Sequence, residues 1–242
     1  MKNKDQWQNK KYRYIEKSNK YEVRLENVNP RSVYLNSVII PVYAKIIKQH
    51  VKGELLDLGC GLVPFYSMYK DLIKNNTCVD WENSDHKTSF LDVFADLNQP
   101  LPLESEKYDT VLLTDVLEHI YKPHELIKEI ERVLLPNGKL IITVPFFYWI
   151  HEPPFDFYRY TKFSLQRFCE DNNLSIVVLE PYGGYPDILL DLLNKKLVSN
   201  IYLAKAFMGI TALFRNSKWF ANWRKRTSES YPLGYCLVAK KK

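Results

Sequence analysis

The chain has 242 residues, of which 46% are hydrophobic and 26% charged, with a formal net charge of +6 at pH 7. It is long enough to bury a sizeable core, and one α/β domain with elaborations accounts for its length. The four cysteines (Cys60, Cys78, Cys169 and Cys236) are scattered, without the paired spacing of a cysteine-based metal site, and so give no support for zinc. Because residues 1–20 also lack the apolar core of a signal peptide, we expect a reduced, cytoplasmic protein.

Positive charge is concentrated at the two ends of the chain. Residues 1–24 carry a net charge of +5 and residues 215–242 carry +7, so the segment between them is acidic at −6. This distribution indicates a polyanionic neighbour, such as a membrane surface, nucleic acid or phosphorylated substrate, or else solubilising tails. Residues 1–29 are interpreted as a basic arm, either mobile or a lid over the site.

An amphipathic helix is predicted over residues 30–50, where apolar residues recur at helical spacing. Pro41 lies inside this pattern and predicts a kink or a break into two helices. Gly53 follows closely, and we expect the first strand of a sheet to begin there.

Residues 54–65, ELLDLGCGLVPF, predict a buried strand, a glycine turn and a helix N-terminus. Asp57 interrupts the apolar run, and a carboxylate is costly to bury unless it is paired. Gly59 and Gly61 allow a sharp turn and bring backbone N–H groups close to a ligand. Pro64 suits the first turn of a helix. This order of features predicts a nucleotide-type binding site.

The residues after Gly61 indicate which nucleotide this site binds. A dinucleotide fingerprint has a third glycine beside the pyrophosphate, and this sequence continues with Leu-Val-Pro instead. With an acid before the first glycine, D-L-G-C-G resembles motif I of the class I S-adenosylmethionine-dependent methyltransferases. The resemblance implies that Asp57, Gly59 and Gly61 hold the methionine end of the cofactor.

The next helix is predicted over residues 64–74, followed by a short strand over 77–79 that ends at Asp80. Asp80 lies 23 residues after Asp57, close to the spacing at which nucleotide folds place a carboxylate on the ribose hydroxyls. The alternative is an aspartate that caps a helix or a turn. Trp81 either stacks on adenine or belongs to the core.

Residues 90–103 occupy the place where class I methyltransferases have an acid-led turn after the third strand. By this resemblance the carboxylate of Asp96 accepts from the adenine amino group, and Leu97 or Asn98 offers a neighbouring backbone N–H.

The β-branched run 108–114 predicts the fourth, central strand, which ends at Thr114. Open α/β sheets bind ligands at this carboxyl end, so Thr114 is a further candidate for the cofactor site. A helix is predicted over residues 123–135, closed by Asn137-Gly138, and a fifth strand over 139–144.

At this point the resemblance becomes specific, and it covers roughly residues 30–182. The series ELLDLGCGLVPF, DLNQPLPLESEKYDTVLLTDVLEHI and EIERVLLPNGKLIITVPF is similar to the methyltransferase type 11 group of the class I superfamily. Residues 151–161, HEPPFDFYRYT, resemble a segment of a bacterial subset often found among cell-surface polysaccharide enzymes.

The implied fold is a Rossmann-like, seven-stranded class I methyltransferase sheet with flanking helices. A helix over residues 163–173 and strands over 174–180 and 235–239 complete it, the last strand being antiparallel. Residues 183–234 form an apolar, basic-aromatic insertion of helical pattern between the last two strands. We expect a helical cap, a homodimer interface or, as the alternative, peripheral membrane contact.

Asp115, Glu118 and His119 have i, i+3, i+4 spacing and could share one helical face. Some quinone-type methyltransferases use a comparable E-x-x-E-H array to hold a divalent metal. The alternative is that Glu118 caps or pairs while His119 borders the cofactor pocket. We adopt the second interpretation and predict no metal site.

The acceptor side is predicted from a cluster that follows the fifth strand. His151 is the candidate general base, because the ordinary pKa of histidine, about 6.5, suits proton removal near neutrality. Glu152 or Asp156 would orient its ring, and Arg159 would hold an anionic or hydroxyl-rich part of the acceptor. The alternative is that His151 and Asp156 only fix the loop, while proximity supplies most of the rate. Tyr148 and Tyr160 are candidate substrate-binding residues.

These features predict O-methylation of a small, sugar-like acceptor by S-adenosylmethionine. A hydroxylated or phosphorylated sugar of a surface polysaccharide, or its precursor, suits the polar and aromatic cluster. The basic ends raise methylation of nucleic acid as a competing hypothesis, although no RNA-binding module is recognised. Methylation of a quinone-type aromatic acceptor is also compatible with the sequence, as is a relative that binds the cofactor without catalysis.

Overall fold

The computed structural model describes residues 1–82 and 89–242. The chain divides into two compact units. The first comprises residues 1–8, 47–180 and 235–242, and the second comprises residues 9–46 and 181–234.

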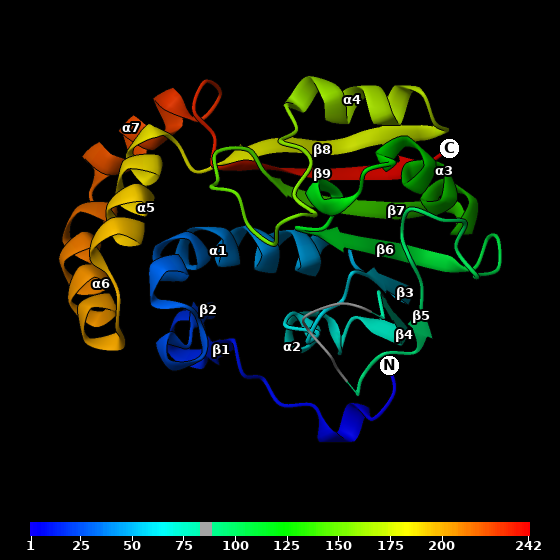
Figure 1. The fold of residues 1–242 in the computed structure, drawn as a ribbon, viewed down its shortest axis with the longest axis horizontal. Coiled ribbons are helices and arrows are strands. Elements are labelled where there is room, and N and C mark those ends of the chain that lie inside the picture. The colour runs from blue at the N-terminus through cyan, green and yellow to red at the C-terminus, as the bar shows by residue number, and fades with distance from the viewer. Residues whose placement is uncertain (83–88) are drawn as a thin grey trace. The chain divides into compact units, whose positions relative to one another are not determined.

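A seven-stranded sheet in the order β5-β4-β3-β6-β7-β9-β8 organises the first unit (Figure 1). Its strands are β3 (Gly53–Leu58), β4 (Ile73–Asp80), β5 (Val93–Phe94), β6 (Tyr108–Thr114), β7 (Leu134–Pro145), β8 (Leu174–Tyr182) and β9 (Gly234–Lys241). The pairs β3–β4, β3–β6, β4–β5 and β6–β7 are parallel. The amide of Lys242 donates to Asn173 O, and that of Leu233 donates to Tyr182 O, so β9 runs antiparallel to β8. The predicted open α/β sheet with its antiparallel last strand is confirmed.

One face of this sheet is buried under α3 (Pro123–Val133) and α4 (Lys162–Glu170). Because successive strand side chains point to opposite faces, alternate residues share this face, among them Leu56, Val111 and Leu140. They pack in one cluster with the apolar sides of the two helices, including Ile127 and Leu165. This packing fixes the strand ends, from which the candidate site is built.

The helix predicted over residues 64–74 is much shorter in the structure. Only α2 (Tyr66–Tyr69) is helical, and β4 begins at Ile73 instead of residue 77. Ile73 already pairs with Gly53 of β3, so the longer strand takes residues that the sequence pattern gave to the helix.

Asn137-Gly138 does not cap a helix, as predicted, but lies inside β7. Tyr108 of β6 is paired with Leu134 and Thr110 with Lys139, so β7 carries extra residues between these two pairs. Asn137 has a φ of 65°, which a bulge accommodates and which asparagine tolerates better than most residues. The predicted break at Pro41 is also absent, because α1 (Val33–His50) runs through it.

Much of the predicted arm is folded. Residues 12–15 (β1) and 20–23 (β2) pair as an antiparallel hairpin in the second unit. Short 3-10 turns lie along this segment: η1 (Lys4–Gln6), η2 (Glu16–Ser18), η3 (Leu25–Asn27) and η4 (Pro30–Ser32). In the first unit, the Trp7 indole N–H donates to Val63 O at 3.1 Å, next to the glycine turn.

The insertion consists of three helices, α5 (Tyr185–Leu197), α6 (Ile201–Arg215) and α7 (Lys218–Thr227). Asp187 of α5 is fully buried and forms two hydrogen bonds of 2.6 Å with the guanidinium of Arg224 on α7. The hydroxyl of Tyr34 on α1 also donates to this carboxylate, at 2.9 Å. This buried ion pair therefore links three helices of the second unit.

The side chains of Tyr202, Ile210 and Leu213 on α6 are largely exposed. Over residues 1–82 and 89–242, no helix is long and apolar enough to cross a membrane. The role of the insertion as a cap, interface or membrane-contacting element stays a prediction.

Removing the arginine from the buried ion pair should destabilise the second unit. Arg224→Met leaves the Tyr34 hydroxyl as the remaining side-chain partner of the Asp187 carboxylate. The free energy of unfolding should fall by about 2–3 kcal/mol, less than for a fully buried pair because the Arg224 side chain is partly exposed. Urea unfolding followed by tryptophan fluorescence, to which Trp219 and Trp223 of α7 contribute, measures the change. Lys225→Met, one residue along the same helix but exposed, should shift the unfolding free energy by less than about 0.5 kcal/mol. Equal effects of the two variants would contradict this role of the ion pair.

Candidate functional site

The glycine turn after β3 is held by its backbone and has no room for side chains at Gly59. Gly59 has a φ of 67°, and a Cβ there would lie 2.5 Å from Cγ2 of Val116. Its N–H donates to Val79 O at 2.8 Å, which fastens the turn to β4. Gly61 has a φ of 51°, a conformation that glycine adopts without strain.

Asp80 lies at the carboxyl end of β4 and connects the glycine turn to the next loop. Its Oδ2 accepts from the Gly61 N–H at 2.7 Å, and its Oδ1 accepts from the Trp81 N–H at 2.7 Å. Each carboxylate oxygen can accept a second hydrogen bond, so Asp80 retains acceptor capacity toward a ligand. The Trp81 ring packs edge-on against Phe155, with 5.1 Å between centroids.

Asp57 is buried within β3, and its carboxylate accepts from the Tyr69 hydroxyl at 2.9 Å. Asn76 in turn donates to the tyrosine oxygen at 3.0 Å. Burial raises the pKa of Asp57 to about 7, the Tyr69 hydrogen bond opposes this rise and the nearby Asp80 adds to it. Tyr69 is thus the partner that the buried carboxylate requires, and any contact of Asp57 with a cofactor stays a prediction.

The turn after β5 is closed by Asp96 and Asn98. Oδ1 of Asp96 accepts from the Asn98 backbone N–H at 2.9 Å, while the Asn98 side chain accepts from the Tyr121 N–H at 2.9 Å. Leu97 between them is buried in the core, and Thr114 ends β6 as predicted. Asp80, Asp96 and Thr114 therefore lie at or shortly after the carboxyl ends of β4, β5 and β6, which are parallel strands of the same sheet.

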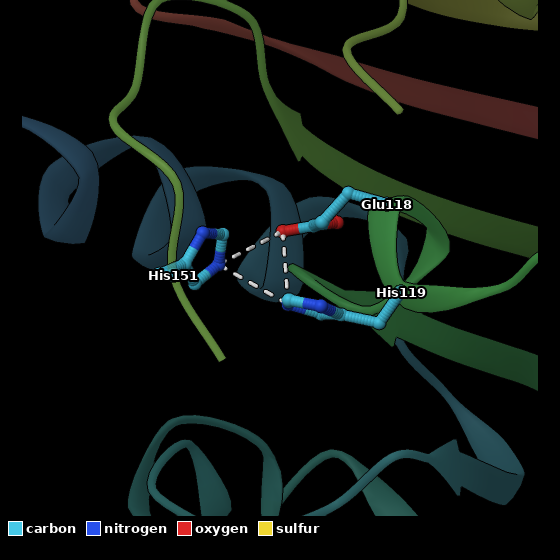
Figure 2. A group of neighbouring side chains, drawn as sticks. All are labelled: Glu118, His119 and His151. Atoms are coloured by element: carbon cyan, nitrogen blue, oxygen red, sulfur yellow. Dashed lines mark hydrogen bonds and ion pairs between the residues drawn. The ribbon is translucent and has the colours of Figure 1, made fainter. Parts of the chain in front are cut away.

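The structure brings Glu118 and His119 of η5 (Leu117–His119) together with His151, which follows β7 (Figure 2). Nε2 of His119 lies 3.1 Å from Nε2 of His151. Oε1 of Glu118 lies 3.8 Å from Nε2 of His119 and 3.9 Å from Nε2 of His151. We call these three side chains the Glu-His-His cluster.

Burial and charge shift the pKa values within this cluster. Glu118 is fully buried, and neither of its carboxylate oxygens accepts a hydrogen bond from another of the residues described. Burial, followed by the Asp115 carboxylate, holds the pKa of Glu118 well above its usual range. Burial and the neighbouring His119 lower the pKa of His151, which Asp156 partly counteracts.

The loop that carries His151 is clamped by Asp156 and Arg159. The Arg159 guanidinium donates to both carboxylate oxygens of Asp156, at 2.6 and 2.8 Å, and this pairing holds the pKa of Asp156 well below its usual range. Arg159 also donates to three backbone carbonyls, those of Tyr148, Trp149 and Tyr158. Asp156 accepts from the His151 N–H at 2.9 Å. The predicted contact of Arg159 with an acceptor stays a prediction.

The two tyrosines predicted to bind substrate have different surroundings. The ring of Tyr148 packs edge-on against His151, with 5.0 Å between centroids. Tyr160 is buried, and its hydroxyl donates to Leu117 O at 3.1 Å. Tyr160 thus lies under η5 in the core and supports the segment that carries Glu118.

Asp115, Glu118 and His119 do not share one helical face, contrary to the prediction from their spacing. Asp115 has a φ of 53° and precedes the short 3-10 turn, and its Oδ1 accepts from the Thr143 hydroxyl. His151 takes the third place in the cluster, from a segment 32 residues away. The sequence signal that could have found it is the position of His151 after a strand adjacent to β6.

The fold of this chain is similar to those of solved methyltransferases. A methyltransferase from Archaeoglobus fulgidus described as SAM dependent has a TM-score of 0.55 at 19% identity, covering 83% of this chain and 90% of that one. The [4+2]-cyclase SpnF has a TM-score of 0.52 at 17% identity, covering 83% and 80%. The chain therefore has the Rossmann-like fold of class I methyltransferases, a fold shared with a protein described as a cyclase.

Residues 56–142 match the family described as "Methyltransferase domain". The uncharacterized protein MJ1123 of Methanocaldococcus jannaschii is 28% identical over 110 residues, 45% of this chain and 53% of that protein. The demethylmenaquinone methyltransferase of Chlamydia pneumoniae is 42% identical over 48 residues, 20% of each chain. The matches thus span about half or less of these relatives. Residues 56–142 are thus similar to a methyltransferase domain, and they lie within a sheet of the class I methyltransferase fold.

The buried Asp57 should make stability depend on pH. Its raised pKa means that the folded state holds a proton which the unfolded chain, with an aspartate pKa near 3.9, releases. Wild-type stability should therefore fall relative to Asp57→Asn as the pH rises from about 4 to about 7, by up to ~4 kcal/mol. Urea unfolding of both proteins at several pH values measures the difference. A difference independent of pH would show that Asp57 titrates alike in both states.

Proposed function

We propose that this protein transfers the methyl group of S-adenosylmethionine to an oxygen of a small hydroxylated or phosphorylated acceptor. A sugar of a surface polysaccharide or its precursor is the acceptor class we favour. The proposal depends on one observation: the glycine turn with Asp80, proposed to hold the cofactor, is connected by contacts to the Glu-His-His cluster, proposed to lie beside the acceptor. Trp81, beside the glycine turn and Asp80, contacts Phe155, whose carbonyl lies 2.8 Å from Nδ1 of His119.

The cofactor side of the proposal uses the loops after β3, β4 and β5. Gly59 and Gly61 leave the backbone open to the methionine end, beside Asp57. Asp80 receives the ribose hydroxyls on its remaining acceptor sites, Trp81 stacks on the adenine and Asp96 accepts from its amino group. His119 borders the same pocket from η5, next to Val116, which packs against Gly59.

The acceptor side needs little covalent chemistry from the protein. A sulfonium is intrinsically reactive, so aligning the acceptor oxygen and removing its proton supply most of the rate. His151 is the proposed base. Its lowered pKa keeps the ring neutral near pH 7, the form that accepts a proton, and Asp156 Oδ2 lies 3.3 Å from its Nδ1.

A quinone-type aromatic acceptor is the second candidate. The observation that favours it is the 48-residue match to a demethylmenaquinone methyltransferase. Incubation with methyl-labelled S-adenosylmethionine and separate panels of nucleotide sugars, quinone precursors and RNA discriminates among the acceptor classes. Label incorporated only into nucleotide sugars or glycans supports the favoured acceptor. Label incorporated only into quinone precursors or RNA overturns the sugar-like acceptor. If S-adenosylmethionine stays unconsumed with all three panels, the protein does not transfer its methyl group to these acceptor classes.

Replacing Asp80 should weaken cofactor binding. Asp80→Ala removes charge-assisted hydrogen bonds worth roughly 1.5–3 kcal/mol, so the dissociation constant for S-adenosylmethionine should rise by ~10- to ~100-fold. Calorimetry measures it. Asp71→Ala changes an exposed acid shortly before the same strand and should leave the affinity unchanged. Unchanged affinity in Asp80→Ala, with normal melting, would remove Asp80 from the cofactor site.

Replacing His151 should slow turnover without affecting the cofactor. A positioned base contributes ~10²–10⁴ in rate, so His151→Ala should lower turnover by at least ~100-fold with S-adenosylmethionine affinity intact. Wild-type activity should rise with pH as His151 loses its proton, below the usual histidine range, and the variant should lack this limb. His124→Ala, an exposed histidine on α3, is the control. A loss of only a few-fold with the same pH profile would make His151 a loop residue.

A further inference from the structure

The three polar atoms of the Glu-His-His cluster form a compact triangle (Figure 2). Its sides are the distances of 3.1, 3.8 and 3.9 Å among the two Nε2 atoms and Oε1 of Glu118. The point equidistant from the three atoms lies about 2.1 Å from each, the radius of the circle through them, which is the usual length of a zinc–nitrogen or zinc–carboxylate bond.

In place of the sequence-based prediction of no metal site, we propose that Glu118, His119 and His151 bind a divalent first-row transition-metal ion. Two imidazole nitrogens and one carboxylate oxygen make a donor set that suits zinc, manganese, iron(II) or cobalt. Magnesium and calcium prefer oxygen ligands throughout, so they fit this set poorly. Three protein ligands also leave positions on the metal for an oxygen atom of a ligand.

Hydrogen bonding at the far nitrogen of His119 turns its metal-binding nitrogen toward the centre of the triangle. Phe155 O can only accept, so at 2.8 Å it places a proton on Nδ1 of His119 and leaves a lone pair on Nε2 of the neutral ring. That lone pair lies 3.1 Å from Nε2 of His151. A carbonyl or carboxylate on the far nitrogen is the usual arrangement for metal-binding histidines.

The far nitrogen of His151 faces a carboxylate at ion-pair distance, without a hydrogen bond. Nδ1 of His151 lies 3.3 Å from Asp156 Oδ2, and this carboxylate is itself fixed by Arg159. A proton on Nδ1, favoured by the carboxylate, leaves the His151 Nε2 lone pair facing the one on His119. Two lone pairs at 3.1 Å repel unless a cation lies between them, either a shared proton or a metal ion.

Glu118 supplies the negative charge of the site. It is fully buried, neither carboxylate oxygen accepts from another described residue, and Oε1 points toward both histidines (Figure 2). A buried carboxylate without a hydrogen-bond donor is costly, and a coordinated cation removes that cost. Its backbone is fixed because Glu118 O accepts from the amides of Phe157 and Tyr158.

The chemistry of this metal rests on the function proposed above, whereas its binding does not. An acceptor hydroxyl on the ion would have a lowered pKa and release its proton to water. That oxygen would then attack the methyl carbon of S-adenosylmethionine. The carbon–oxygen bond would form as the carbon–sulfur bond breaks, and the electron pair of the broken bond would stay on sulfur in S-adenosylhomocysteine. The base role proposed above for His151 belongs to the metal-free protein, because in the loaded protein His151 would be a ligand.

Metal binding is measured without cofactor or acceptor. The full-length protein is treated with a chelator, desalted and titrated with Co²⁺, followed by visible absorption, and with Zn²⁺ in competition with a chromophoric chelator. We expect one equivalent bound by wild type and by His124→Ala, and at least ~10-fold weaker binding by Glu118→Gln, His119→Ala and His151→Ala. Glu118→Gln keeps the side-chain shape, and melting curves verify that each variant is folded.

The same samples separate this proposal from the proposed function. Wild type that binds no more Co²⁺ or Zn²⁺ than Glu118→Gln overturns the metal site, even if the protein binds S-adenosylmethionine and transfers its methyl group. Conversely, one metal equivalent that requires all three side chains supports the site even if no cofactor binds. A folded variant of any one of the three that retains wild-type metal affinity also overturns the assignment.

Discussion

The parallel pairing of β3 with both β4 and β6 is the constraint on which the site depends. Asp57 is in register with Cys78 on one side and with Leu112 on the other, so the three strands end at nearly the same level. The turns that follow them therefore meet at one edge of the sheet, where open α/β folds bind ligands. The close approach of Gly59 to Val116 ties the turn after β3 to the segment after β6. The residues proposed to bind the cofactor and the acceptor thus lie at the same edge of the sheet.

Much of this frame was predictable because it depends on local patterns. The apolar run of β6 and the glycine turn after β3 follow from residue type and spacing, and both lie where predicted. The predictions were wrong where pairing between strands outweighed local preference. Ile73 joins β3 as a strand residue, and Asn137 lies in a bulge of β7 because the register with β6 shifts there. Such pairings depend on residues far away in sequence, which periodicity does not detect.

The candidate site shows the same division. Asp80 was predictable from its distance along the chain after Asp57, because both follow the repeating geometry of a strand and its turn. The meeting of His151 with Glu118 and His119 was not, since it requires the loop after β7 to fold back onto η5. The hydrogen-bond partner of His119 is the backbone carbonyl of Phe155. Every residue has such a carbonyl, so the residue type at this position could not predict the contact.

The hydrogen bonds between η5 and the loop that follows β7 have a consequence for how substrates enter and products leave. The Glu118 carbonyl accepts hydrogen bonds from two backbone amides of this loop, and Nδ1–H of His119 donates to the carbonyl of Phe155 in the same loop. The Tyr160 hydroxyl donates to the Leu117 carbonyl of η5. Moving the loop away from η5 would break all of these hydrogen bonds together and leave polar groups without partners. We therefore expect the loop to keep its position during turnover, so that substrates and products enter and leave without displacing it. The acceptor would then meet a preformed surface, and selection among acceptors would rest on shape more than on closure.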